Sequence, residues 1–410
     1  MTALALSFPR LRARLDALAE IGAFQPGGVA RLALTDADKD GRDLVVTWMR
    51  DLGLRIDLDG IGNIVGTWPA DRYEPPVLTG SHIDSVATGG IYDGALGVLA
   101  GLEVIETVAA AGIDTEHPIA VGVFTDEEGS RFAPDMLGSL VYVGGLALET
   151  ALDTPAVDGA VLRDELERIG YAGPSPCPAV PPHAFVELHI EQGPVLEAEG
   201  VEIGVVTGVQ GISWTELTIT GQSNHAGTTP MDHRHDAGLV AAEIAVGMRA
   251  LAEELGPPMV ATVGRIELHP NLVNVVAARA VLTVDLRHTD DRVLTAAEAA
   301  LDSLCDELRE REGVTIATRS LARFEPVQFD DTIVELVEQV AEGQGRSTKR
   351  MPSGAGHDAQ MLARVCPAGM VFVPSAGGVS HNPAEHTDDE QLAAGADVLL
   401  QVMLELARTR

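Results

Sequence analysis

Residues 94–125 read GALGVLAGLEVIETVAAAGIDTEHPIAVGVFT, and this stretch decides the fold class. Its first part, 94–111, is apolar nearly all round and predicts a buried helix, and its last part, 118–125, predicts a buried strand. Before it, residues 61–68 and 76–81 predict two short strands. Strands that alternate with helices in this way are typical of an α/β domain whose helices cover a sheet.

A second rhythm begins further along the chain. Between residues 213 and 323 the pattern predicts strand, helix, strand, strand, helix and strand, at 213–220, 236–255, 259–268, 275–286, 291–312 and 313–320. This order is the ferredoxin-like β-α-β-β-α-β arrangement. Residues 325–410 then return to α/β alternation. We therefore predict that residues 208–324 form a domain inserted into an α/β domain made of residues 1–207 and 325–410.

The charge of the chain excludes some classes of partner. It has 28 basic and 61 acidic residues, which gives a formal net charge of −33. A surface with that charge repels phosphate backbones and anionic lipids, so nucleic-acid and membrane-surface binding are not expected. The simpler interpretation of the charge is that it keeps the protein soluble.

Cysteine use and hydropathy indicate a cytoplasmic protein. The three cysteines, Cys177, Cys305 and Cys366, are far apart and form no CxxC pair. Neither a disulfide framework nor a thiolate zinc site is therefore expected, and a reducing compartment fits. Charged residues interrupt the N-terminal segment 1–24, which predicts an amphipathic helix rather than a signal peptide. No apolar run reaches the roughly 18 residues of a membrane span.

The densest group of polar residues is GSHIDS at residues 80–85, directly after the apolar end of a predicted strand. A neutral imidazole such as that of His82 is a good ligand for zinc-type ions, and the carboxylate of Asp84 can orient it. YDG follows at residues 92–94, where the predicted helix begins. Asp93 either caps that helix or bridges two metal ions with its two oxygens.

The next polar group, TDEEGSRF at residues 125–132, follows a buried strand directly. Adjacent acids at a strand end point in different directions. One of Glu127 and Glu128 can thus bind a metal while the other handles a proton, as metal-assisted hydrolysis requires. The alternative is a solvated acidic turn, but the apolar strand delivers these acids to the sheet edge where α/β sites form.

Two further polar groups complete the pattern. His189 lies in AFVELHIE at residues 184–191, where alternating polar and apolar residues predict a strand with His189 on its polar face. SHNPAE occupies residues 380–385 after another apolar strand. A single histidine on a strand is more often structural than functional. However, five such groups at the ends or on the polar faces of predicted strands indicate one metal-dependent site.

The predicted inserted domain contributes His225, Asn274 and Arg287. Histidine and asparagine side chains are suited to stabilising an oxyanion, and arginine is suited to binding a carboxylate with two hydrogen bonds. Each could equally be an ordinary polar residue of the surface.

Seven strings in this order resemble the M20-type metallopeptidase and amidase superfamily, and most closely its hydantoinase/carbamoylase branch. They are GSHIDS, YDG, DEEGSRF, ELHIEQGP, NHAGTTPM, SGAGHDAQ and SHNPAE. The resemblance covers nearly the whole chain. It implies a metal-dependent exopeptidase-like catalytic domain and an inserted ferredoxin-like domain that serves as a lid and forms a homodimer interface.

The resemblance also implies roles for individual residues. It implies two divalent ions (Zn²⁺, Mn²⁺, Co²⁺ or Ni²⁺), with Asp93 shared between them and the ligands His82, Asp93, Glu128, His189 and His381. It implies Glu127 as the general base and Asp84 and His225 as further catalytic residues. It implies that the substrate contacts Gln192, His225, Asn274, Arg287 and Gly356, and that His225 often serves the site of the partner subunit.

The function that this resemblance implies is hydrolysis of the ureido C–N bond of N-carbamoyl-L-amino acids to the L-amino acid, ammonia and carbon dioxide. The main alternative is an allantoate amidohydrolase, which would share the active-site strings. A small-amide or dipeptide hydrolase and a non-catalytic binding protein on the same fold are further alternatives. An inactive relative would be expected to lose a ligand or the base, and the strings above retain all of them.

Overall fold

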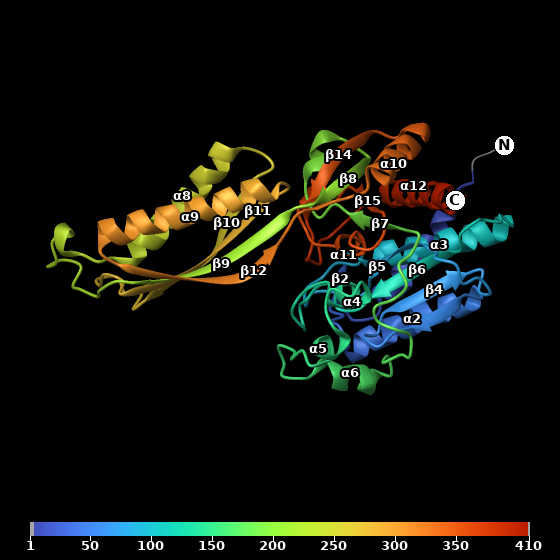
Figure 1. Cartoon of the computed structure of the whole chain (residues 1–410), viewed down its shortest axis with the longest axis horizontal. Helices are drawn as coiled ribbons and strands as arrows, with labels where there is room; N and C mark the ends of the chain where they lie inside the picture. The colour runs from blue at the N-terminus through green and yellow to red at the C-terminus, as the bar shows by residue number, and fades with distance from the viewer. Residues whose placement is uncertain (1–3, 409–410) are drawn as a thin grey trace. The chain divides into compact units, whose positions relative to one another are not determined.

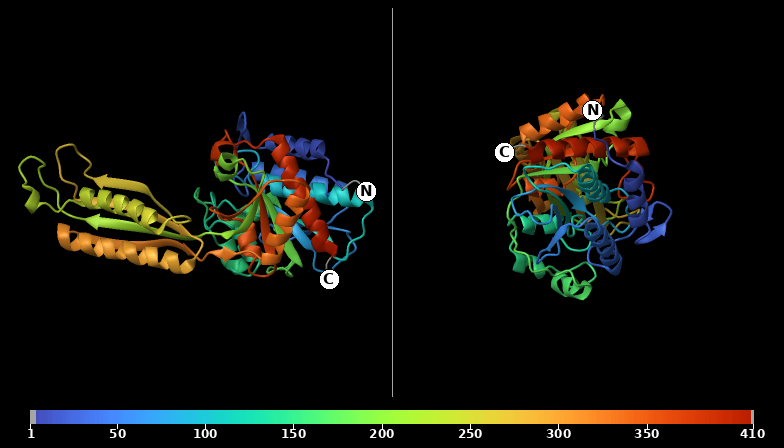
Figure 2. Two further views of the ribbon diagram at one scale, coloured as in Figure 1. Left: turned by 90° about the horizontal axis from the view of Figure 1, so that it is seen from above. Right: turned by 90° about the vertical axis from the view of Figure 1, so that its right-hand side faces the viewer.

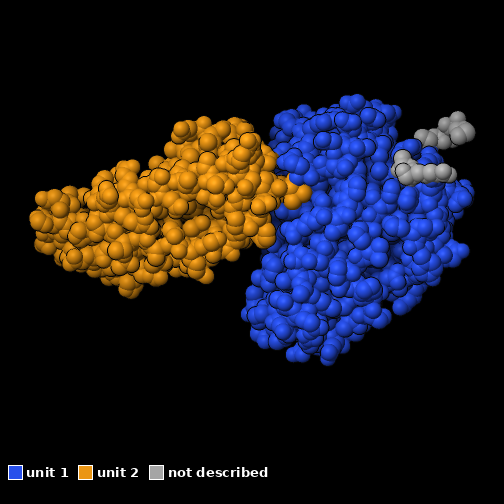
Figure 3. All heavy atoms as spheres, viewed as in Figure 1, with its two compact units in different colours: residues 1–208, 328–410 blue, residues 209–327 orange. Residues whose placement is uncertain are grey.

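The chain forms two compact units in the computed structural model, which describes residues 4–408. Residues 1–208 and 328–410 form the larger unit, and residues 209–327 form the smaller one (Figure 3). The predicted domain bounds also include residues 1–3 and 409–410, which lie outside the described residues. Among residues 4–408, no helix is both long enough and apolar enough to cross a membrane.

The larger unit is a layered α/β structure (Figure 1). Its strands are β1 (Ala23–Gln25), β2 (Gly28–Val29), β3 (Arg55–Leu58), β4 (Ile64–Trp68), β5 (Val77–His82), β6 (Ile119–Phe124), β7 (Ala184–Ile190), β8 (Ile203–Val209), β13 (Val327–Gln328), β14 (Thr348–Ser353) and β15 (Ala368–Val373). Its helices are α1 (Phe8–Ala19), α2 (Asp36–Asp51), α3 (Ala95–Ala111), α4 (Leu137–Tyr142), α5 (Leu148–Leu152), α6 (Leu162–Ile169), α7 (Val195–Glu199), α10 (Asp331–Gly343), α11 (Asp358–Leu362), η2 (Ala376–Gly378) and α12 (Asp389–Arg408).

A mixed sheet forms the centre of this unit. Its strand order is β13-β8-β15-β7-β5-β6-β4-β3, and β14 also pairs with β8. The four middle strands, β15, β7, β5 and β6, run parallel to one another, whereas β8 is antiparallel to β15, β4 to β6 and β3 to β4. Because β6 and β7 lie on opposite sides of β5, the chain changes direction there, and α/β sheets bind ligands at the carboxyl ends of strands at such a point.

Helices cover both faces of the middle strands. α3 and α12 pack on one face and against each other, as both views of Figure 2 show, and α11 packs on the other face with α4. From Ala95 to Val108, every residue of α3 except Glu106 is buried, which explains why this part of its sequence is apolar all round. β7 is likewise buried along its whole length, so the polar face predicted for it does not meet solvent. Leu188 faces α12, while Glu187 accepts a hydrogen bond from the Ala359 N–H at the start of α11.

The smaller unit has the predicted order of six main elements. They are β9 (Gly211–Thr220), α8 (Ala237–Leu255), β10 (Val260–His269), β11 (Arg279–His288), α9 (Asp291–Glu312) and β12 (Thr315–Phe324), with the short helix η1 (Met231–His233) before α8. The sheet order is β10-β11-β9-β12, and all neighbours are antiparallel. Apolar residues of α8 and α9 pack on one face of this sheet to form a separate core.

Candidate metal and active site

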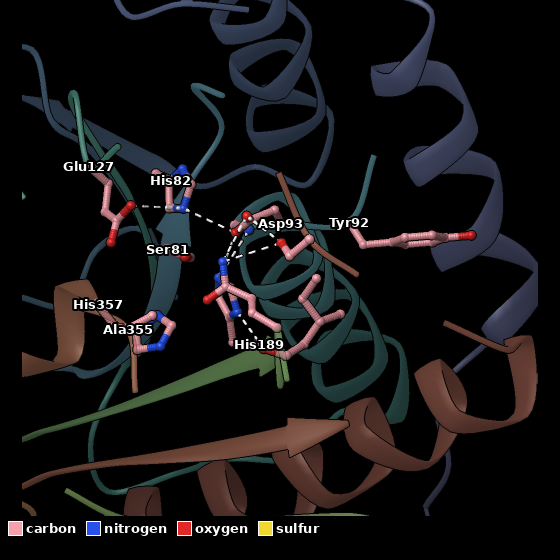
Figure 4. A network of polar contacts seen from close by, with 12 residues as sticks. Ser81, His82, Tyr92, Asp93, Glu127, His189, Ala355 and His357 are labelled. Atoms are coloured by element: carbon pink, nitrogen blue, oxygen red, sulfur yellow. Dashed lines mark hydrogen bonds and ion pairs between the residues drawn. The ribbon is translucent and has the colours of Figure 1, made fainter. Parts of the chain in front are cut away.

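The polar groups of the larger unit meet at the carboxyl ends of its parallel strands. β5 ends at His82, and His189 is the penultimate residue of β7. Glu127 and Glu128 follow the end of β6. Figure 4 shows the side chains of His82, Asp93, Glu127 and His189 gathered at this edge of the sheet. The sheet therefore brings together residues that are up to about a hundred positions apart in the sequence.

One group of metal-type ligands consists of His82, Asp93 and His189. Asp93 Oδ1 lies 3.1 Å from His189 Nε2 and 3.8 Å from His82 Nε2. Both imidazoles place Nδ1 against a backbone oxygen, that of Asp84 at 2.9 Å and that of Ile190 at 2.8 Å. A carbonyl can only accept a hydrogen bond, so Nδ1 of each ring carries a proton and Nε2 is the nitrogen that can bind a metal ion.

A second group consists of Asp93, Glu128 and His381. His381 Nε2 lies 3.2 Å from Asp93 Oδ2 and 3.2 Å from Glu128 Oε2. Asp93 therefore turns one carboxylate oxygen toward each group, which is the arrangement that a bridging ligand needs. Imidazole and carboxylate are ligands that Zn²⁺, Mn²⁺, Co²⁺ and Ni²⁺ all accept, so these residues fit a pair of divalent ions.

Asp93 does not cap α3, so the simpler alternative for this residue is wrong. The N-cap of α3 is Gly94, with a φ of +62°, and no side chain caps the helix. A Cβ atom at Gly94 would come within 2.4 Å of the His82 ring. Glycine at this position thus lets His82 approach the start of α3, and the Asp93 carboxylate faces the histidines.

Glu127 lies beside the first group without belonging to either group. Its Oε2 is 3.3 Å from His82 Nε2, and the residue is buried. Burial, together with the charges of Asp358 and Glu128, raises the pKa of Glu127 well above its usual value. A buried carboxyl group next to a cluster of metal-type ligands, with a raised pKa, is the kind of group that exchanges protons during catalysis.

Asp84 lies behind His82 and holds the acidic turn in place. Its carboxylate accepts hydrogen bonds from the backbone N–H groups of Glu127 at 3.3 Å and Glu128 at 3.4 Å. Its Oδ1 is also 3.8 Å from His82 Nδ1. Burial, and secondarily the charge of Asp38, raises the pKa of Asp84 to about 7. These contacts connect the end of β5 to the turn that follows β6.

Gln192 contacts the ligand groups directly, and Gly356 lies in a loop of the larger unit. The Gln192 side chain donates a hydrogen bond from Nε2 to Asp93 Oδ2 at 2.9 Å, and its backbone has a φ of +58°. Gly356 lies in the loop between β14 and α11, where a Cβ atom would come within 2.9 Å of the Met136 side chain.

The structure places the three residues of the smaller unit at opposite ends of its sheet. His225 and Asn274 lie together, because His225 bridges to Val275 and the Ala226 N–H donates to the Asn274 carbonyl. They lie beyond the end of the sheet where Thr220 pairs with Arg279, whereas Arg287 lies near the other end. At about 3.4 Å per residue, the eight residues from Arg279 to Arg287 span roughly 27 Å.

Arg287 is held against its neighbours on the open face of that sheet. Its Nε and Nη2 donate to the Asp285 carboxylate at 2.9–3.1 Å. Its guanidinium carbon lies 5.9 Å from the centre of the Trp214 ring. His225 is exposed, and its Nδ1 accepts hydrogen bonds from the N–H groups of Gly227 and Thr228.

Several residues to which the motifs assigned no role surround the metal-type ligands. Glu385 accepts hydrogen bonds from the N–H groups of Tyr92 and Asp93, and Glu187 accepts one from Ser81. The His357 ring packs edge-on against His189, with 4.6 Å between ring centroids, and its Nε2 lies 2.9 Å from Ser353 Oγ. Glu385 and His357 lie in the strings SHNPAE and SGAGHDAQ, but only the three-dimensional contacts show which residues they support.

We expect the affinity of the site for a divalent cation to increase with pH between 7 and 9. Burial disfavours a charge on His189, but the hydrogen bond and charge of Asp93 outweigh it and raise the pKa of His189 to about 9. A cation must displace that proton from Nε2, so the affinity should fall about tenfold for each pH unit below 9.

The measurement is calorimetric titration with Mn²⁺ at pH 7 and pH 8, in two buffers that differ in ionisation enthalpy, which counts the protons released. Burial lowers the pKa of His82 to about 4, so this residue should release none in that range. Binding without proton release at pH 7 would contradict the expected state of His189.

Comparisons with known proteins agree on the family of this chain. A sequence model described as peptidase family M20/M25/M40 matches residues 78–405. The chain is 44% identical over 399 residues to an N-carbamoyl-L-amino-acid amidohydrolase of Rhizobium meliloti, which covers 97% of this chain and 96% of that protein. It is 35% identical to the allantoate amidohydrolase of Bacillus subtilis, over 96% of each chain.

The fold is similar to that of solved structures as well. The crystal structure of an amidase of the hydantoinase/carbamoylase family from Burkholderia multivorans aligns with a TM-score of 0.95 and 47% sequence identity, over 99% of each chain.

Proposed function

Since the chain belongs to peptidase family M20/M25/M40, as its motifs predicted, we propose that it hydrolyses the ureido C–N bond of N-carbamoyl-L-amino acids. The products are the L-amino acid, ammonia and carbon dioxide. The observation that carries this proposal is the shared position of Asp93, with one oxygen toward each ligand group and Glu127 beside them. The relative from Rhizobium meliloti, which is named for this substrate class, supports it.

The proposed roles of the larger unit follow its geometry. His82, Asp93 and His189 hold one divalent ion, and Asp93, Glu128 and His381 hold the second. When bound, such ions lower the pKa of water and polarise the carbonyl group of a substrate. Glu127 takes the proton of the attacking water and returns it to the leaving nitrogen. Asp84 orients His82 and the acidic turn, while Gln192 and Gly356 contact the substrate.

The predicted inserted domain, residues 208–324, which corresponds closely to the smaller unit, acts in this proposal as a ferredoxin-like lid. Its sheet order and its two helices on one face support that fold. Arg287 binds the carboxylate of the substrate, and Asp285 and Trp214 hold its guanidinium group in place. Residues 1–207 and 325–410 form the catalytic domain.

We propose a homodimer formed through residues 208–324, and the positions of His225, Asn274 and Arg287 support it. The roughly 27 Å between the two ends of the sheet prevents Arg287 from reaching the same substrate as His225 and Asn274 of its own chain. We therefore propose that the partner subunit supplies His225 and Asn274, which stabilise the oxyanion. The edge strand β10, whose side chains are largely exposed, is available for that contact.

Ammonia release from a panel of N-carbamoyl-L-amino acids, allantoate and β-ureidopropionate tests the proposal. We expect kcat/KM for N-carbamoyl-L-methionine to exceed that for allantoate by at least about tenfold, or about 1.4 kcal/mol in transition-state binding. The enzyme should be reconstituted with Mn²⁺ or Zn²⁺ and its metal content measured.

The similarity to an allantoate amidohydrolase makes allantoate the second candidate substrate. Turnover of allantoate alone would keep the metal chemistry and replace the substrate class. No turnover of any ureido compound by the metal-loaded enzyme would refute the proposed bond specificity, and short peptides would then be tested.

A further inference from the structure

The two ligand groups differ in how the protein supports their histidines. His82 and His189 belong to the central strands β5 and β7, and their side chains are only 2% and 1% exposed. His381 lies in the segment between β15 and α12, outside any helix or strand, and its side chain is 49% exposed. Its backbone has a φ of +54°. The sheet fixes the histidines of the first group. The second group has no such backbone support, so it depends on contacts from neighbouring side chains.

Glu385 supplies contacts of this kind. Its carboxylate is buried, and its Oε1 accepts hydrogen bonds from the backbone N–H groups of Tyr92 at 3.0 Å and Asp93 at 3.2 Å. Its Oε2 lies 2.8 Å from the hydroxyl of Ser380, the residue that precedes His381. One carboxylate thus joins the backbone of the shared ligand Asp93 to the segment that carries His381.

Ser380 adds a second link between the same two parts. Its hydroxyl oxygen lies 3.2 Å from Asp93 Oδ2, the oxygen that also faces His381. The packing around Glu385 is close as well, since a Cβ atom at Gly90 would come within 2.2 Å of its carboxylate. The 89–94 turn and the 380–385 segment are therefore fitted to each other through Glu385.

We propose that Glu385 is a positioning residue that fixes His381 relative to Asp93 and so determines the affinity of the second ligand group. This inference rests on the proposed binding of two ions. It assigns an unequal effect to the loss of Glu385: the group built on His381 loosens, whereas His82 and His189 stay fixed by β5 and β7. Partners behind metal ligands typically contribute 10- to 100-fold in affinity.

The test is calorimetric titration of the chelator-stripped full-length protein with Mn²⁺. We expect two binding events in the wild type. In Glu385→Ala the weaker event should lose about 10- to 100-fold in affinity, while the tighter one changes by less than about threefold. Ser380→Ala, a smaller change, should weaken the same event in the same direction. Thermal denaturation of the stripped proteins establishes that each variant is folded.

Two further variants separate positioning from charge and from general damage. Glu385→Gln retains an oxygen that can accept both backbone hydrogen bonds, so both affinities should stay within about threefold of wild type. Asp330→Ala removes another carboxylate that accepts two backbone hydrogen bonds, at the start of α10, and should leave both events unchanged.

Each remaining outcome overturns the inference. Equal losses at both events would show that Glu385 acts through Asp93 alone, and a loss in Glu385→Gln as large as in Glu385→Ala would show that charge matters instead of position. Unchanged affinities in both Glu385→Ala and Ser380→Ala would remove any role. A single binding event in the wild type would refute the two-ion centre itself, and this inference with it.

Discussion

Replacing Glu127 with glutamine is expected to lower kcat about 10³-fold while both ligand groups still bind metal. The amide cannot accept a proton, and Glu127 belongs to neither ligand group. Its Oε2 lies 3.3 Å from His82 Nε2, so the substitution keeps the shape of the site and removes only the proton acceptor. Ammonia release from N-carbamoyl-L-methionine, with metal content measured on the same sample, provides the test.

Glu103→Gln is a suitable control for this substitution. Glu103 is also a buried glutamate, but it pairs with Arg10 and Arg14 between α1 and α3. We expect Glu103→Gln to lower the free energy of unfolding by about a few kcal/mol and to leave kcat unchanged. Full turnover by metal-loaded Glu127→Gln would mean that another group is the base.

Removing the metal with a chelator is expected to reduce turnover by about 10³-fold or more, and addition of Mn²⁺ or Zn²⁺ should restore turnover. Glu127 is buried, the side chains of Asp93 and Glu128 are only 6% and 5% exposed, and without cations the charges of these three neighbours oppose one another. Binding should therefore also raise Tm, by an amount equivalent to about 4 kcal/mol at a metal concentration 1,000 times Kd.

Asp93→Asn should imitate this removal, because both ligand groups share Asp93. A chelator-treated sample that is shown to be free of metal and yet retains turnover would refute the proposed metal chemistry. Glu128→Gln offers a comparison, since it changes only one of the groups and should spare the Tm increase from the other.

Local pattern was sufficient for most of the elements that build the site. The apolar run 94–111 predicted α3, which begins one residue later, and the run 118–125 predicted β6 within one residue at each end. These predictions succeeded because burial on all sides leaves a continuous apolar sequence, whether in a helix or in a parallel strand. The alternating pattern of 184–191 also predicted β7, although both of its faces are buried.

The candidate site could be predicted to the level of residue type and approximate place. His82, Asp93, Glu128, His189 and His381 were singled out, and the structure brings all five together. What the pattern could not supply was the division of Asp93 between two groups. That depends on how the start of α3 meets the ends of β5 and β7, which is a matter of packing.

The sequence could not predict which residues position others through tertiary contacts. Glu385 is one more acid in a polar string until the fold places its oxygens against the backbone of Asp93. In the same way, His225 and Arg287 look equally suited to one substrate until the register of β9 and β11 separates them by most of a strand length.

The sequence by itself determined which segments are buried and which chemistry is available, because hydrophobic periodicity and side-chain type are properties of neighbouring residues. Only the tertiary structure decided which oxygen of Asp93 faces which histidine, which acid lies beside the ligand groups without joining them, and which end of the smaller sheet carries Arg287. These are distances between atoms far apart along the chain. They arise from strand order, register and helix packing, which no local pattern contains.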